Sequence, residues 1–453
     1  MFVGLFLVLM GYIAYFNIVQ AKTIINSPYN RRQDIFADRV VRGKILDKDG
    51  EVLAETNVNE EGNETRSYPH SDLYAHVLGY SVKGKAGLES VENFNLLTSN
   101  AFILERMFKE FQGEKNIGDN IVTTLDTNLQ QAAYNALGDQ KGAVVVMEAS
   151  TGKILSMVSK PTYDPNDVAE NWASLNADED SALLNRATQG KYAPGSTFKL
   201  VTALAYMRQN SQYPSYSYDC TSEISYEGTT IHCNGDVAHG QEDLRASVAN
   251  SCNASFSNIG LSLNMKKFRE TTKDLLFNSE LPSPLMYGES KFLLSEKDSS
   301  AEVMMTSIGQ GKTQVSPYHM ALITSAIANG GKLMKPYLVD RITNYGGTTV
   351  TKNMPEEYKQ LMTSKEAAQL TEYMTAVVEE GTAKALRGQS YTVAGKTGTA
   401  EYSIDKTKTH SWFVGFTNVD NPELVISVVV EGSDASGVRA VNVAKKVFNS
   451  YYG

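Results

Sequence analysis

The sequence predicts an α+β fold in which strands from distant parts of the chain form one sheet around helical insertions. Residues 143–147 and 153–158 are apolar and rich in β-branched side chains on either side of a Ser-Thr-Gly turn, which indicates a hairpin of buried strands. Residues 411–417 and 424–430 have the same character near the other end of the chain. Apolar positions at helical spacing fill the middle, at 200–206, 248–263, 320–328 and 367–378. Strands at both ends around a helical middle predict one sheet closed by distant segments.

The 453 residues are enough for two or three domains. We expect an apolar segment at 1–20, a mixed N-terminal domain at 21–120 and a main domain at 121–453. The N-terminal domain alternates short apolar runs with turn-rich stretches. Asp49-Gly50 lies between two such runs and predicts a hairpin turn.

Composition excludes several classes of function. Hydrophobic residues make up 42% of the chain and charged residues 21%, a balance typical of a protein with a packed core. The chain has 42 Lys and Arg against 51 Asp and Glu, a net charge of −9. This charge disfavours nucleic acid as a partner, because phosphate binding needs clustered cations. The sequence contains no Gly-rich phosphate loop of the P-loop or Rossmann type, which disfavours nucleotide chemistry.

Residues 1–20 carry no charged side chain, and Tyr12 and Tyr15 could serve as interfacial anchors. About 20 apolar residues suffice to span a bilayer, so we expect a transmembrane helix. A cleaved signal peptide is the alternative, although a basic start and a small-residue cleavage site are not evident. Arg31 and Arg32 follow the segment, and the positive-inside rule would keep the rest of the chain in the cytoplasm. Because long domains translocate regardless of charge, we expect an exported main domain and a short basic tail upstream of this sequence.

A candidate nucleophile and its base lie in Pro194-Gly-Ser-Thr-Phe-Lys199, just before an apolar helical run. Pro and Gly mark the start of a helix, so Ser196 and Lys199 stand at i and i+3 on one face. A lysine can deprotonate a serine only if burial or a second cation destabilises its ammonium form. A capping serine beside a solvated lysine is the alternative interpretation, and the short pattern alone does not separate the two.

The second motif, Ser251-Cys-Asn253, lies inside a predicted helical segment. The hydroxyl of Ser251 can relay protons between a nucleophile, a lysine and a leaving amine. The amide of Asn253 can donate a hydrogen bond to a substrate carbonyl. Helix capping is the alternative, because Ser and Asn both favour the starts of helices.

The third motif, Lys396-Thr-Gly-Thr399, is expected on a strand because β-branched threonines flank its glycine and a strand follows. Lys396 supplies a cation that can bind a carboxylate and lower the pKa of Lys199. Gly398 has no Cβ, so another backbone can approach, and a peptide can add along an edge strand there. An ordinary strand end is the alternative interpretation.

These elements are SxxK, SxN and KTG in that order, and with them the chain resembles the penicillin-binding proteins and serine β-lactamases. Further elements are similar to class B penicillin-binding proteins along almost the whole chain. They are Arg42–Gly50 (R-G-x-I-x-D-x-x-G), Arg66–Pro69 (R-x-Y-P), Ala75–Tyr80, Gly84–Glu89, Ile308–Gly311, Ser316–Pro317 and Glu380–Thr382. The resemblance implies a transpeptidase fold with a central antiparallel sheet flanked by helices, an all-helical subdomain and an elongated N-terminal pedestal. We expect those of the elements that lie in the pedestal to form Arg–carboxylate pairs and glycine turns.

The resemblance implies a peptidoglycan D,D-transpeptidase that needs no cofactor for catalysis. Ser196 would attack the penultimate D-alanine of a stem peptide while Lys199 takes its proton. Ser251 would pass a proton to the departing D-alanine. An amine of a second stem peptide would then take the acyl group and form the cross-link. β-Lactams are expected to acylate Ser196, because they mimic the acyl-D-Ala-D-Ala backbone.

The same resemblance implies how the substrate is held. Lys396 and the two threonines of the KTG strand would bind the terminal carboxylate, and Asn253 would hold the peptide amide. The backbone N–H groups of Ser196 and Thr399 would form the oxyanion hole. The substrate-binding residues are thus Asn253, Thr397, Gly398 and Thr399, beside the catalytic Lys396.

Three related activities compete with cross-linking. A β-lactamase needs a deacylating base, and the glutamate–asparagine element of class A enzymes is not evident after Ser251. A D,D-carboxypeptidase shares the acylation step and differs only in its acceptor. A β-lactam sensor or an inactive scaffold is the non-enzymatic alternative.

A pedestal of this length holds no glycosyltransferase domain, so the resemblance implies a partner polymerase of the SEDS type in the cytoplasmic membrane.

A secondary site is expected between the first two motifs, where Cys220 and Cys233 are close to His239 and Asp236 in sequence. An exported protein could join the two cysteines in a disulfide. Two thiolates with His239 or Asp236 could instead hold a structural zinc ion. Reduced core thiols are the third interpretation. Cys252, inside the SxN motif, is interpreted as a packing residue.

Overall fold

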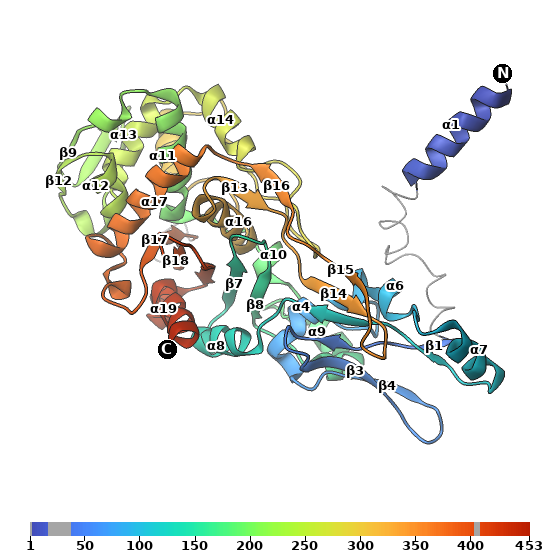
Figure 1. The fold of residues 1–453 in the computed structure, drawn as a ribbon. Coiled ribbons are helices and arrows are strands. Elements are labelled where there is room, and N and C mark those ends of the chain that lie inside the picture. The colour runs from blue at the N-terminus through green and yellow to red at the C-terminus, as the bar shows by residue number, and fades with distance from the viewer. Residues whose placement is uncertain (1, 17–37, 403–407) are drawn as a thin grey trace. The chain divides into compact units, whose positions relative to one another are not determined.

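The structure, a computed structural model, describes residues 2–16, 38–402 and 408–453 (Figure 1). The chain forms two compact units, each gathered from three segments that are distant in sequence. Unit 1 comprises Met1–Thr124, Thr162–Glu179 and Val339–Met354, and unit 2 comprises Leu125–Pro161, Asp180–Leu338 and Pro355–Gly453. The domain boundaries expected at residues 20 and 120 stay predictions.

Unit 1 is built on a six-stranded sheet with the strand order β15-β14-β6-β2-β3-β4. Its strands are β2 (Ile45–Leu46), β3 (Val52–Val58), β4 (Glu64–Ser67), β6 (Asn120–Thr123), β14 (Val339–Thr343) and β15 (Thr349–Lys352). β2 and β3 are antiparallel, and Gly50 between them has a φ of 95°, which suits a residue without a Cβ. The carboxylate of Asp47 accepts the N–H of Glu51 at 2.8 Å across this turn. The hairpin predicted at Asp49-Gly50 is therefore confirmed.

A second, parallel pairing in unit 1 joins β1 (Val40–Val41) to β5 (Asn116–Ile117). Short helices complete the unit. They are α4 (Ala75–Leu78), α5 (Gly87–Val91), α6 (Asn93–Leu96), α7 (Ile103–Phe111) and α9 (Val168–Ala177), with the 3₁₀ turns η2 (Ser71–Tyr74) and η3 (Pro165–Asp167). Val77, Leu88 and Leu96 are fully buried among them.

A buried ion-pair network ties the elements of unit 1 together. The carboxylate of Glu89, on α5, accepts from Arg42 Nε at 2.6 Å and from Arg66 Nε at 2.7 Å. Burial opposes the ionisation of Glu89, but the two guanidinium groups outweigh it and lower the pKa of the carboxyl. Arg66 also donates to the carbonyl of Gly43 at 2.7 Å. The Arg–carboxylate pairs predicted for the pedestal elements are confirmed.

The N-terminal helix α1 (Phe2–Tyr15) is apolar, and its side chains are exposed. Residues 17–20 of the predicted membrane span lie outside the described residues. Within the described ranges, no helix has both the length and the hydropathy that crossing a bilayer requires. The transmembrane helix at 1–20 therefore stays a prediction.

Unit 2 is built on a five-stranded antiparallel sheet with the order β17-β18-β19-β7-β8. The strands are β7 (Gly142–Glu148), β8 (Ile154–Lys160), β17 (Val393–Glu401), β18 (Thr409–Thr417) and β19 (Leu424–Val430). Val146 pairs with Ile426 where β7 meets β19. Strands from the two ends of the chain therefore form one sheet, as predicted. Helices α8 (Thr127–Leu137) and α19 (Ala440–Tyr452) pack on one face, and α10 (Arg186–Gln189) and α16 (Pro317–Ala328) on the other (Figure 1).

A helical subdomain lies beside the β17 edge of this sheet (Figure 1). Its helices are α11 (Lys199–Gln209), α12 (Leu244–Ala249), α13 (Asn253–Ser262), α14 (Met265–Asp274), α15 (Ser300–Ser307) and α17 (Ser364–Glu379). Phe198, at the start of α11, stacks on Phe292 and meets Phe277 edge-on, both with ring centroids 5.8 Å apart. This aromatic core fixes the position of the first motif.

Short two-stranded sheets surround the subdomain. They pair β9 (Tyr218–Cys220) with β12 (Gly240–Glu242), β10 (Glu223–Tyr226) with β11 (Thr229–His232), and β13 (Lys332–Met334) with β16 (Glu357–Gln360). The remaining short elements are η4 (Gly195–Phe198), η5 (Tyr213–Ser215), η6 (Asn234–Asp236), η7 (Lys384–Leu386) and α18 (Ser433–Ser436). Cys220 is the last residue of β9, Cys233 follows β11 directly, and His239 directly precedes β12.

The helical character predicted at 248–263 is confirmed, but the chain forms two helices there, α12 and α13, with a break between them. Ser251 lies in the break with a φ of 56°, in the left-handed region. The thiol of Cys252 then caps α13 by accepting the N–H of Ser255 at 3.3 Å. Hydrophobic spacing did not show this interruption, because the apolar positions continue in step on both sides of it. The break places the SxN motif in a tight turn at a helix start.

Candidate active site

The first motif lies where η4 leads directly into α11. Gly195 has a φ of 54°, and a Cβ built on it would lie 2.5 Å from the carbonyl oxygen of Thr399. A glycine is therefore needed for η4 to approach β17 so closely. Ser196 follows it and is half-buried, whereas Lys199 is fully buried on the same helical run. The predicted helix start is confirmed, with one 3₁₀ turn ahead of the α-helix.

Two lysine amines meet at the hydroxyl of Ser251. Lys199 Nζ donates to Ser251 Oγ at 3.2 Å, and Lys396 Nζ donates to the same oxygen at 2.9 Å. Lys199 Nζ also donates to the carbonyl of Ser251 at 2.6 Å and to Oδ1 of Asn253 at 2.7 Å. The structure therefore brings the SxxK, SxN and KTG motifs together through their side chains, as the sequence analysis expects.

Burial governs the charge of both amines. It lowers the pKa of Lys199 to about 8. Burial, followed by repulsion from the charge of Lys199, lowers the pKa of Lys396 well below its usual range. Both side chains have no exposed surface. Two ammonium ions cannot share so small a dry space cheaply, so a neutral amine is available near neutral pH.

The third motif lies on β17, at the edge of the five-stranded sheet, as predicted. Thr399 is exposed and Thr397 half-buried, so both can be reached from outside the sheet. A Cβ on Gly398 would lie 3.0 Å from the side chains of Thr197 and Trp412. The glycine thus permits the close packing of η4 against β17. Its predicted contact with a bound peptide stays a prediction.

An open pocket of about 1080 Å³ adjoins these residues. Its lining includes the motif residues Ser196, Ser251, Asn253, Thr397, Gly398 and Thr399. Within the described residues, no hydrogen bond joins the Ser196 hydroxyl to either lysine: Lys199 Nζ donates to the SxN loop, and Lys396 Nζ donates to Ser251 and to the carbonyl of Thr397. Such bonds commonly tighten only when a substrate is bound, so this geometry is compatible with Ser196 as a nucleophile.

Residues beyond the three motifs complete the site. Thr382 shares a 2.5 Å hydrogen bond between hydroxyls with Thr397. Gln310 donates from Nε2 to the carbonyl of Thr399 at 3.3 Å and accepts the N–H of Glu401 with Oε1 at 3.3 Å. In the sequence, their segments Ile308–Gly311 and Glu380–Thr382 stand out only as family landmarks. That resemblance was the one signal that pointed to them.

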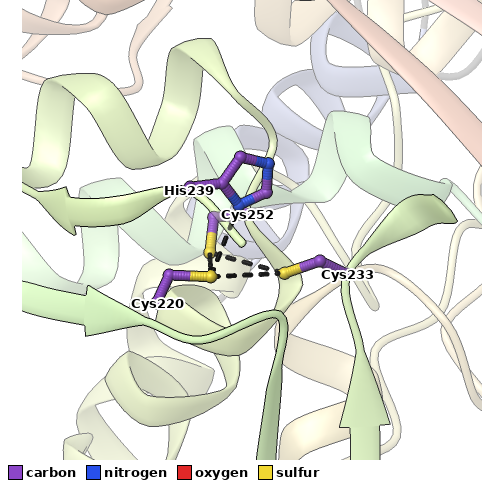
Figure 2. Close-up of side chains that lie close together, drawn as sticks. All are labelled: Cys220, Cys233, His239 and Cys252. Atoms are coloured by element: carbon purple, nitrogen blue, oxygen red, sulfur yellow. Dashed lines mark hydrogen bonds between the residues drawn. The ribbon is translucent and has the colours of Figure 1, made fainter. Parts of the chain in front are cut away.

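Directly behind the SxN loop, three thiols and one imidazole converge (Figure 2). The Sγ atoms of Cys220 and Cys252 are 3.4 Å apart, and each lies 3.7 Å from Sγ of Cys233. Nδ1 of His239 is 3.4 Å from Sγ of Cys220. All four donor atoms lie within 4.8 Å of one another. The arrangement has the size of a four-ligand metal site.

This cluster differs from the ligand set expected from the sequence. Asp236 lies outside it, with an exposed carboxylate 3.0 Å from Nδ1 of His232. The chain turns through positive φ at Gly235 and Asp236, which carries that side chain to the surface. Cys252, interpreted as a packing residue, takes the fourth position. Cys220 and Cys233 are free thiols in the structure, so the disulfide interpretation is not supported.

Two family models match the chain. The penicillin binding protein transpeptidase domain matches residues 142–449, and the penicillin binding protein A dimerisation domain matches residues 42–121. Among curated relatives, the peptidoglycan D,D-transpeptidase PbpA of Mycolicibacterium smegmatis is 32% identical over 427 residues, which is 88% of this chain and 86% of the relative.

Solved structures agree with the family models. The crystal structure of PBPA from Mycobacterium tuberculosis superposes with a TM-score of 0.83 at 29% identity, over 91% of this chain and 99% of that chain. The penicillin G acyl-enzyme complex of penicillin-binding protein A from the same organism gives a TM-score of 0.82 at 30% identity, with the same coverage of both chains. A D,D-transpeptidase domain from Eggerthella lenta gives 0.82 at 31% identity, over 91% of this chain and 98% of that chain. This chain therefore belongs to the class B penicillin-binding proteins.

Proposed function

We propose that the chain is a peptidoglycan D,D-transpeptidase in which Ser196 carries the acyl group. One observation carries the proposal: the hydroxyl of Ser251 accepts hydrogen bonds from two buried amines, Lys199 and Lys396, beside the pocket that Ser196 lines. This arrangement supplies a base, a proton relay and a cation next to one candidate nucleophile. The activity named for the relatives described above is the same.

The first half-reaction is acylation. Neutral Lys199 takes the proton of Ser196 while Oγ of Ser196 attacks the carbonyl carbon of the penultimate D-alanine. The backbone N–H groups of Ser196 and Thr399 stabilise the oxyanion, and losing one such donor costs about 3–4 kcal/mol in other enzymes. The C–N bond to the terminal D-alanine then breaks. Ser251 gives its proton to the leaving amine and regains one from Lys199.

The KTG strand holds the substrate in this proposal. A stem peptide adds along the free edge of β17, where Lys396, Thr397 and Thr399 bind its terminal carboxylate. The side-chain amide of Asn253 donates to a substrate carbonyl. In the structure this amide donates to the carbonyl of His232 at 2.8 Å, so substrate binding exchanges one acceptor for another.

The second half-reaction separates cross-linking from its rivals. An amine of a neighbouring stem peptide attacks the ester on Ser196, and water must be kept away for this route to dominate. The test is to give the full chain pentapeptide-bearing glycan strands and to analyse the products by mass spectrometry. We expect cross-linked dimers with one D-alanine released per link. Tetrapeptides without dimers would indicate a carboxypeptidase, steady turnover of penicillin a β-lactamase, and acylation without peptide products a sensor; each result would contradict the proposal.

The rate of penicillin acylation is expected to rise with pH and to level off above about 8. Lys199 acts as a base only when neutral, and its pKa is about 8 because burial disfavours the ammonium form. Below that pKa, the neutral fraction falls about tenfold per pH unit. The measurement is the second-order rate constant for a fluorescent penicillin across this range, with intrinsic fluorescence as the control for folding. A flat profile, or a rate that falls as pH rises, would contradict Lys199 as the base.

We also propose that Cys220, Cys233, Cys252 and His239 bind one structural zinc ion. The donor set fits, because three sulfurs and one imidazole nitrogen suit tetrahedral zinc. Two thiolates each about 2.3 Å from a tetrahedral ion lie about 3.8 Å apart. The observed sulfur separations of 3.4 to 3.7 Å are close to this value. Bound zinc would fix the loop that carries Ser251 and Asn253, and no catalytic step needs it.

Metal content distinguishes this ligand set from the one expected from the sequence. Purified protein should contain about one zinc per chain, and replacing either Cys220 or Cys252 by serine should remove most of it. The Asp236→Asn variant should keep its zinc, because that carboxylate lies outside the cluster. Elemental analysis with thiol titration provides the measurement. Zinc loss in Asp236→Asn but not in Cys252→Ser, or wild-type protein without metal, would sink the assignment.

The chain's location and partner complete the proposal. We propose that residues 1–20 anchor the chain in the cytoplasmic membrane, with residues 21–120 as pedestal and 121–453 as an extracytoplasmic transpeptidase domain. The uncharged, apolar segment supports the anchor. A SEDS-type membrane polymerase would supply the glycan strands. Protease protection of vesicle-bound protein would test the orientation.

A further inference from the structure

Helix α7 in unit 1 has its amphipathic faces reversed relative to a soluble protein. Three of its four charged residues, Glu105, Arg106 and Lys109, are partly buried, and the fourth, Glu110, is exposed. Nζ of Lys109 lies 4.8 Å from the ring centroid of Tyr345, and Nε of Arg106 has almost no exposed surface. A surface helix normally buries its apolar stripe and exposes its charges. Here the polar face contacts the protein and the apolar face is turned outward.

The outward face is large and continuous. It consists of Phe102, Ile103, Leu104, Met107, Phe108 and Phe111, whose exposed fractions lie between 60% and 91%. Single exposed apolar residues are ordinary on protein surfaces, but a contiguous set marks an interaction site. We call this set the α7 face.

The α7 face lies next to the point where the N-terminal segment enters unit 1. The strand β5 follows α7 almost at once, and its Asn116 pairs with Val40 and donates its N–H to the carbonyl of Arg39 at 3.1 Å. Residues 21–39 separate this point from the apolar segment 1–20. A fully extended chain of that length spans at most roughly 65 Å, so the chain enters unit 1 within that distance of the apolar segment. A membrane that holds the N-terminal segment is therefore within reach of α7.

We propose that the α7 face inserts into the interface of the lipid bilayer and forms a second, peripheral membrane contact. An interfacial helix has this make-up: aromatic and aliphatic side chains on one face and charged side chains on the other. Residues 21–39 contain four basic residues (Lys22, Arg31, Arg32 and Arg39) and two acidic ones (Asp34 and Asp38), a net positive charge that attracts anionic lipid headgroups. The inference rests on the proposed membrane anchor and is independent of the transpeptidase chemistry.

Site-specific photocrosslinking tests the contact in the full chain. The photoreactive residue benzoylphenylalanine replaces Phe108, and in a matched control it replaces Tyr358, an exposed aromatic residue of unit 2. Each protein is reconstituted in vesicles of phosphatidylethanolamine and phosphatidylglycerol, irradiated and analysed by mass spectrometry. Flotation of the vesicles reports the anchor separately. Lipid adducts at position 108 should exceed those at position 358 by about fivefold or more.

Three results would overturn the inference. Protein that floats with the vesicles but gives equal lipid adducts at both positions would leave the α7 face in water. A covalent dimer through position 108 would assign the face to a second copy of the chain. Protein that fails to float would remove the anchor and this contact together, while penicillin labelling of the same sample would still report on the transpeptidase proposal.

Discussion

The Ser196→Ala variant is expected to lose all covalent labelling by a fluorescent penicillin. The variant keeps η4 and the buried amines but has no hydroxyl to form the ester, so no acyl-enzyme can accumulate. Gel fluorescence after a saturating incubation measures the effect. Because Ser196 is only half-buried, we expect the variant to keep its fold, and matched thermal unfolding curves check this.

Ser251→Ala is the matched control, because it removes a neighbouring hydroxyl from the same pocket. The variant should still become labelled, but about 10²–10⁴-fold more slowly, since a proton relay contributes that much to a typical enzyme. The contrast between complete loss and slow labelling assigns the two hydroxyls to different roles. Stoichiometric labelling of Ser196→Ala would remove Ser196 from the mechanism.

Replacing Glu89 by alanine is expected to destabilise the protein by about 3–5 kcal/mol. The substitution leaves the guanidinium groups of Arg42 and Arg66 buried without their carboxylate, and both are at most 10% exposed. The free energy of unfolding, measured in urea, gives the effect. Because Glu89 lies in unit 1 and the catalytic motifs in unit 2, folded variant protein should still be labelled by penicillin.

Glu55→Ala serves as the control for this prediction. Glu55 pairs with Lys44 at 2.7 Å, with side chains 29% and 47% exposed. An ion pair this exposed contributes at most about 1 kcal/mol. Equal losses in the free energy of unfolding for the two variants would contradict the claim that burial makes the Glu89 network more stabilising than an exposed ion pair.

Much of the fold could be predicted because its main strands have clear local sequence patterns. The β7–β8 hairpin and the strands β18 and β19 are short apolar runs bounded by turn residues. Because these strands lie at both ends of a helical middle, the sequence also predicted that they form one sheet. The interruption at Ser251 could not be predicted in the same way. It depends on a positive φ and on a thiol cap, neither of which changes hydrophobic spacing.

Part of the candidate site could likewise be predicted from the sequence, and part could not. The motif residues were found by type and order, and the structure places them around one pocket, while their catalytic roles stay predictions. Cys252 was missed as a member of the thiol cluster because its neighbours are set by tertiary structure. Only the pairing of β9 with β12 and the turn after β11 bring Cys220, His239 and Cys233 to it. Asp236, close in sequence, is carried away by the same turn.

Mapping the acylated residue is the most direct test of the central claim that Ser196 is the nucleophile served by two buried amines. Full-length protein is incubated with penicillin, its intact mass is measured, and the modified peptide is sequenced after proteolysis. We expect a single penicilloyl adduct on the peptide that contains Ser196. An adduct on Ser251 or elsewhere, or a protein of unchanged mass, would contradict it.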